Sequence, residues 1–205
     1  MIFQKLIEDE LNEHRRIYAE LFDRSKEAVE ALAKEGFEIP FEIRVAAEVT
    51  LSHRLFKEVE RLKGDDKSRM EGKEIDGIVD EAGKFGYHLR REESLLILNE
   101  ILREKMGLLW TPEGSNIIGQ AERIEEIIRF LDRVEKWGFE ISKQEAQDLM
   151  DQMLKEYVGG LEKSWWGNGS EKPFPSNLIL LAEKLDFNVE RFSKMVNPAA
   201  STPRS

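Results

Sequence analysis

The sequence of 205 residues predicts an all-α fold made of antiparallel helical hairpins. A segment typical of a helix end occurs four times at intervals of about 50 residues, and an apolar stripe with helical spacing precedes each copy. Charged residues make up 35% of the chain and are dispersed along it, as on the solvated faces of helices. The repeat is compatible with a compact helical bundle or with a short α-solenoid.

One position of the repeat is held by Gly36, Gly86, Gly138 and Asp186, which are 50, 52 and 48 residues apart. Glycine adopts the left-handed conformation after a helix at little steric cost, and an apolar residue that follows it can fold back on the last turn. A lysine two residues earlier suits the C-terminal end of the helix dipole. We therefore expect these four residues to be structural caps, each inside a helical hairpin.

The first half of the chain contains the expected central helix. Residues 2–22 form one predicted helix, and Asp23 or Ser25 can cap a second one that ends near residue 35. Pro40 suits the first turn of the next helix, 41–62, which is the most apolar of the chain. The apolar residues of the first helix lie near one face: Phe3, Leu6, Ile7, Leu11, Tyr18, Leu21 and Phe22.

The rest of the chain continues the pattern. Ser142 and Glu145 match a capping box, in which the glutamate reaches back to the serine amide at a helix start. Residues 1–196 are expected to form a single helical domain of about four helix-turn-helix units, and residues 197–205 a disordered tail. The remaining helices are predicted at 74–85, 90–106, 116–137, 143–158, 177–185 and 190–196.

Composition excludes several classes of partner and site. The formal net charge is −10 without a basic stripe, which argues against a nucleic-acid partner. The chain has no cysteine, so it offers no disulfide and no thiolate site. Its first residues turn acidic too early for a secretory signal, and no apolar run approaches the roughly 20 residues that cross a bilayer. We expect a cytoplasmic protein without a membrane partner.

Titratable residues do not form a recognisable catalytic or metal-binding motif. His14 follows Glu10 by four residues, which is only a fragment of a di-metal carboxylate motif. His53 has no serine and aspartate at a spacing that suggests a triad. The sequence therefore predicts no catalytic residue, no metal ligand and no cofactor.

Tryptophans in the connecting segments are the candidate binding residues. Trp165 and Trp166 are adjacent in the Gly-rich connection 159–176, where they can stack on a sugar ring or anchor a protein interface. The alternative is that they close the open end of the helical array. Trp110, in the connection 107–116, is a third candidate, although packing of that loop on the core is the simpler interpretation.

Three segments carry a resemblance to a known family. Residues 138–142, followed by 145–149 and preceded by 41–48, resemble the helical domain of unknown function that follows the catalytic domain in some family 57 glycoside hydrolases, the α-amylase/α-mannosidase-like group. The resemblance extends over roughly residues 1–195. It implies a non-catalytic accessory domain that stabilises the catalytic domain or assists glycan binding, either excised or as a free-standing relative. A catalytic glycosidase domain or another protein is the implied partner, and an oligosaccharide is a further candidate.

Two other hypotheses stay open. A free-standing helical adaptor would bind proteins through exposed apolar residues on one face of successive hairpins. An enzyme could use carboxylates, such as Glu48 on the central helix beside His53, and would require a buried carboxylate pair in a cleft.

Overall fold

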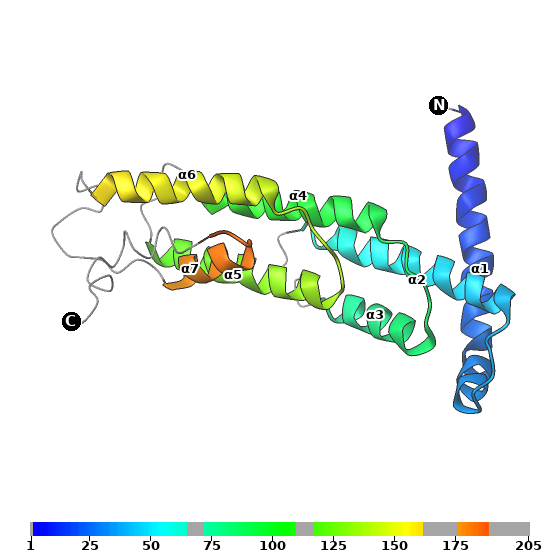
Figure 1. Cartoon of the computed structure of the whole chain (residues 1–205). Helices are drawn as coiled ribbons and strands as arrows, with labels where there is room; N and C mark the ends of the chain where they lie inside the picture. The colour runs from blue at the N-terminus through cyan, green and yellow to red at the C-terminus, as the bar shows by residue number, and fades with distance from the viewer. Residues whose placement is uncertain (1, 65–71, 110–116, 162–175, 189–205) are drawn as a thin grey trace. The chain divides into compact units, whose positions relative to one another are not determined.

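The computed structural model describes residues 2–64, 72–109, 117–161 and 176–188, and these residues are helical apart from short turns (Figure 1). No strand occurs in these ranges, so the all-α prediction is confirmed. The helices are α1 (Ile2–Lys34), α2 (Phe41–Arg61), α3 (Lys73–Phe85), α4 (Glu92–Leu109), α5 (Ile117–Lys136), α6 (Gln144–Leu161) and α7 (Ser176–Lys184).

Contacts divide the chain into two compact units, Met1–Ile97 and Leu98–Ser205. In the first unit α2 packs against both α1 and α3, and in the second α5 packs against α7. The α5–α7 contact joins helices from two different predicted hairpins. The single domain expected over residues 1–196 stays a prediction, and the predicted tail and the last helix at 190–196 lie outside the described residues.

The four predicted caps share one backbone geometry. Their φ angles are +76° at Gly36, +67° at Gly86, +71° at Gly138 and +57° at Asp186. In every turn the residue after the cap donates its backbone N–H to the carbonyl four residues before the cap, with N···O distances of 2.9–3.1 Å. The cap itself donates to the carbonyl three residues before it. This pair of bonds is the Schellman arrangement. Descent of the four turns from one repeated unit stays a prediction.

The apolar residue after the cap is not buried in every turn. Tyr87 and Phe139 are buried, and Tyr87 meets Phe22 of α1 edge-on at 6.4 Å between ring centroids. Phe37 is 66% exposed, so the expectation that it folds back on the preceding helix is wrong. Ile39, two residues further on, is the buried residue of that turn.

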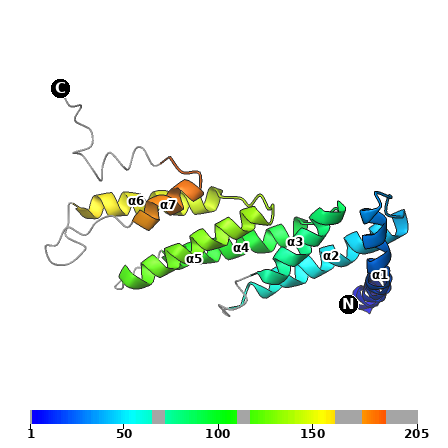
Figure 2. The same ribbon diagram turned by 90° about the horizontal axis from the view of Figure 1, so that it is seen from below.

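The predicted break near residue 23 does not exist, because α1 is one helix of 33 residues. Phe22 and Val29 are both 2% exposed and lie two turns apart, so a continuous helix keeps both side chains on the packed face. Asp23 does not serve as a cap. Its carboxylate accepts hydrogen bonds from Arg54 of α2 at 3.1 and 3.2 Å. This pair links α1 to α2, and the two helices run in different directions (Figure 2).

The predicted capping box at Ser142 is also wrong. α6 begins at Gln144, and Gln147 donates its backbone N–H to the carbonyl of Lys143, which places Lys143 at the cap. The backbone N–H of Ser142 donates instead to Asn99 Oδ1 of α4 at 2.8 Å. A side chain 43 residues away therefore satisfies the amide that the local motif assigned to Glu145.

α2 is the central helix of the first unit, as its apolar composition suggested. Its fully buried residues are Ala46, Ala47, Leu51, Leu55 and Val59. Phe41, at its start, is 73% exposed and takes no part in this core. In the second unit the bulkiest buried side chain is Trp137, which is 2% exposed and stands directly before the cap Gly138.

Alanine substitutions of Gly83 in α3 and of Gly86 at its C-terminal cap are expected to change stability in opposite directions, and together they test the cap. Gly86→Ala should lower the free energy of unfolding by about 1 kcal/mol, because alanine resists a positive φ. Gly83→Ala, inside the same helix, should raise it by about 0.5–1 kcal/mol through helix propensity. A Cβ at either position meets no atom within 4 Å, so crowding does not contribute. Urea unfolding measures both values, and equal effects would contradict the assignment of Gly86.

Candidate functional site

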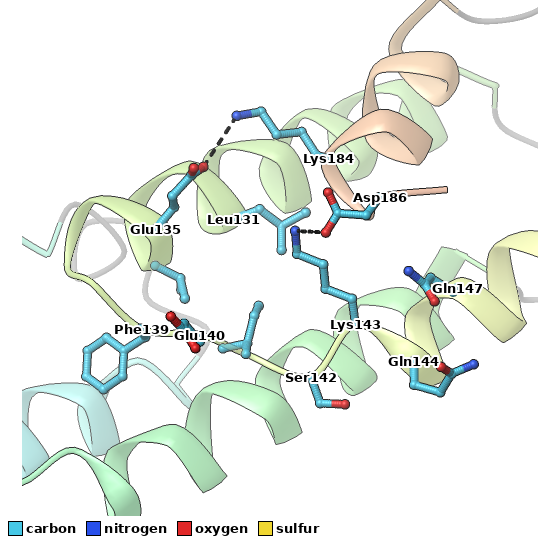
Figure 3. A pocket seen from close by; sticks show the side chains of 12 residues that line it. Leu131, Glu135, Phe139, Glu140, Ser142, Lys143, Gln144, Gln147, Lys184 and Asp186 are labelled. Carbon is cyan, nitrogen blue, oxygen red and sulfur yellow. Dashed lines mark hydrogen bonds and ion pairs between the residues drawn. The ribbon is translucent and has the colours of Figure 1, made fainter. Parts of the chain in front are cut away.

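A hollow of about 560 Å³ lies in the second unit beside the turns that Gly138 and Asp186 cap (Figure 3). α5, the start of α6 and the end of α7 supply its walls. Its charged residues come from all three helices and their turns: Glu135, Glu140, Lys143, Lys184 and Asp186. The two capped turns thus bring together side chains that are about 50 residues apart in the sequence.

Most of these charged side chains form ion pairs or hydrogen bonds. Lys143 Nζ lies 2.7 Å from Asp186 Oδ2, and Lys184 pairs with Asp132 and, at 3.8 Å, with Glu135 (Figure 3). The hydrogen bond to Asp132 is the main cause of a raised pKa at Lys184. Asp186 is 72% exposed, and exposed pairs of this kind contribute about 1 kcal/mol or less. We interpret the hollow as a packing junction held by paired charges.

A second hollow, of about 460 Å³, lies in the first unit among α1, α2 and the start of α4. Its lining mixes cations and anions, with Arg15 and Arg90 near Glu92 and Glu93. The hydroxyl of Ser94 is buried and has no hydrogen-bond partner in the described part of the chain. Polar groups of both signs give this hollow no preference for a ligand of one charge.

His53 lines the hollow of the first unit. Burial lowers the pKa of its imidazole below 6.5, and the positive charges of Arg15 and Lys57 lower it further. The neutral form is therefore favoured in the folded chain. The geometry makes His53 a partly buried neutral side chain of α2.

The pair suggested for an enzyme is not assembled. Glu48 and His53 are five residues apart on α2, which places them about 140° apart around the helix. Glu48 Oε1 accepts the backbone N–H of His88 at 3.0 Å and so holds the turn after Gly86 against α2. Its carboxylate has a structural partner, and His53 faces the hollow without it.

Among the described residues, the most extensive exposed apolar feature is the stripe of α1, defined by Phe3, Leu6, Ile7, Leu11, Ile17 and Leu21. Their side chains are exposed by 81%, 64%, 60%, 46%, 50% and 39%, respectively. In the first unit, this half of α1 extends past its crossing with α2 (Figure 1). Monomeric proteins rarely leave apolar residues in such a continuous group, and such groups mark interaction sites.

Ion pairs cover the opposite side of the same helix segment. Arg16 pairs with Glu13 at 2.6 Å and with Glu20 at 2.5 Å. The hydrogen bond to Arg16 is the main cause of the lowered pKa of Glu13. The N-terminal half of α1 is therefore amphipathic, with a solvated side and an uncovered apolar side.

The structure describes only some of the candidate residues named from the sequence. Trp110, Trp165 and Trp166 lie outside the described residues, so their predicted role stays a prediction. His14 and Glu10 are exposed on α1. Among the described residues, no group of three or more histidine and carboxylate side chains could hold a metal ion, and no helix is long and apolar enough to span a bilayer.

Sequence inspection placed five stripe residues on one face together with Tyr18 and Phe22, and it left out Ile17. It did not show that most of this face is exposed while Phe22 is buried. It missed the Lys143–Asp186 pair and the bond between Asn99 and Ser142, because both depend on partners 43 residues away. The one sequence cue to the Lys143–Asp186 pair is Asp186 itself, which stands at a cap position that glycine holds in the other three turns.

No model of a known protein family, no curated protein and no solved structure matches this chain. The resemblance to the accessory domain of family 57 glycoside hydrolases therefore depends on the three sequence segments alone.

The lowered pKa of His53 predicts a pH-dependent contribution to stability. A group with a depressed pKa in the fold stabilises it fully above the unfolded value of 6.5, and this contribution is lost as the pH falls through the folded value. The stability advantage of the native chain over His53→Gln should therefore shrink between pH 7.5 and pH 5.5. Urea unfolding of both chains at the two pH values checks this, and parallel pH profiles would contradict it.

Polar substitutions of exposed stripe residues are expected to leave the stability of the fold nearly unchanged. Leu6→Gln and Ile17→Gln should each change the free energy of unfolding by less than about 0.5 kcal/mol at low protein concentration, because neither side chain packs in its unit. Phe22→Ala, on the packed face of the same helix, should cost about 3–5 kcal/mol. Losses above about 2 kcal/mol at Leu6 or Ile17 would mean that the stripe is covered within the chain.

Proposed function

We propose that this chain is a non-catalytic helical interaction module that binds an amphipathic helix of a partner polypeptide along the stripe of α1. The observation that carries the proposal is the uncovered apolar side of this helix, with exposures from 39% to 81%. Covering six large apolar side chains would release a substantial hydrophobic free energy. That free energy is available only to a molecule that docks on α1.

The shape of the stripe favours a helix as the occupant. From Phe3 to Leu21 the stripe runs along about 27 Å of a straight α-helix and covers an arc of about 140° around it. The apolar face of another helix has the same length scale and the same periodicity, so the side chains of the two can interdigitate. A compact small molecule would cover only a fraction of this length.

The accessory-domain hypothesis is a specific form of this proposal. If the resemblance to family 57 glycoside hydrolases reflects kinship, the stripe holds the module in an assembly with a catalytic glycosidase domain. Glycan binding through Trp165 and Trp166 would belong to the same role. The free-standing adaptor would use the same surface for another protein. Exposed apolar residues on one face of successive hairpins were expected for it, whereas the stripe lies on the single helix α1. The separate environments of Glu48 and His53 weaken the enzyme alternative.

Site-specific photo-crosslinking tests the proposal. A photo-reactive phenylalanine analogue at position 11 lies on the stripe, and the same analogue at position 12 points about 100° away, toward the solvated side. In cells that produce the chain, position 11 should form crosslinks to a helix of a polypeptide, identified by mass spectrometry, and position 12 should not. Absent crosslinks from position 11, or equal yields at both positions, would refute the proposal.

A further inference from the structure

We infer that the helix bound by the stripe is α1 of a second copy of this chain, packed antiparallel across a two-fold axis. The inference rests on the proposed function, since it names the occupant of the same surface. A two-fold contact requires a surface that complements itself, so that each pair of contacts occurs twice. The order of apolar and charged residues along α1 meets this requirement.

The apolar residues match in one antiparallel register. When two antiparallel helices pair, residues whose numbers have a constant sum face each other across the axis. A sum of 24 places Phe3 opposite Leu21 of the second copy and Ile7 opposite Ile17. All four side chains belong to the exposed stripe, so the register buries both ends of the stripe.

The polar residues within the stripe match in the same register. Glu10 and His14 interrupt the apolar pattern, and both are exposed. Their numbers also sum to 24, so the carboxylate of Glu10 faces the imidazole of His14 in the second copy, twice per dimer. A carboxylate accepts and an imidazole N–H donates, which makes the two groups complementary hydrogen-bonding partners.

Charge disfavours the parallel arrangement. Parallel pairing would place Glu10 of one copy near Glu10 of the other, and like charges that face each other are unfavourable. Arg15 takes no part in the contact, because its side chain lines the hollow between α1 and α2 of its own unit.

The available area suffices for a dimer. If each of the six stripe residues buries on the order of 100 Å², the two copies together bury roughly 1,200 Å², at the lower end of specific interfaces. Phe22, which is buried in the first unit, lies about 100° around the helix from Leu21. Leu11 lies on nearly the same side as Phe22 but three turns earlier along the helix.

Analytical ultracentrifugation of the full chain up to about 100 µM tests the inference. The native chain and Asn12→Asp, on the solvated side, should dimerise, and Ile7→Asp should be monomeric. His14→Glu should weaken dimerisation about tenfold, because it places two carboxylates opposite each other twice per dimer, and the double variant Glu10→Lys/His14→Glu should restore it to within about twofold. Circular dichroism controls for helix content.

Each other outcome overturns the inference. A native chain that is monomeric at the highest concentration has no self-complementary surface, and a dimer that survives Ile7→Asp uses another one. Failure of the double variant to restore dimerisation excludes the antiparallel register. Crosslinks from position 11 to a different polypeptide, with a monomeric chain, would overturn this inference and leave the proposed function standing.

Discussion

The left-handed cap at the end of a helix is the constraint on which most of this structure depends. At Gly36, Gly86, Gly138 and Asp186 one residue with positive φ ends a helix and reverses the chain, and two backbone bonds satisfy carbonyls that would otherwise lack donors. Side chains then attach the turn to its unit: Tyr87 packs against Phe22 in the first unit, and Lys143 pairs with Asp186 in the second. The hollow of the second unit lies beside two of these turns.

Two long-range polar contacts show how tertiary structure uses groups that a helix leaves free. Glu48 of α2 accepts the backbone N–H of His88, and Asn99 of α4 accepts that of Ser142. Each acceptor satisfies an amide in the segment after a capped turn, where the regular helical bonds have ended. A carboxylate on the central helix is thus explained by backbone hydrogen bonding, and catalysis is not needed to account for it.

The two halves of α1 have different contacts. From Phe22 onward the helix packs on α2 and forms ion pairs with α3, and its buried residues hold the first unit together. Before that point its apolar side has no cover within the unit, and its other side is saturated with ion pairs around Arg16. Packing alone does not require the N-terminal half. An interaction through the stripe gives that half a physical reason to be both helical and apolar.

The sequence by itself determined the helical class, the four caps and most helix limits, because glycine conformation and apolar periodicity are local properties. Local cues failed where a distant partner competed with them. Asp23 binds Arg54 and no cap forms there, and Asn99 takes the amide that the motif at Ser142 reserved for Glu145. Only the tertiary structure decided which apolar faces are buried. Leu21 and Phe22 are adjacent and equally apolar, and one is 39% exposed while the other is 2% exposed, because α2 covers a single side of α1.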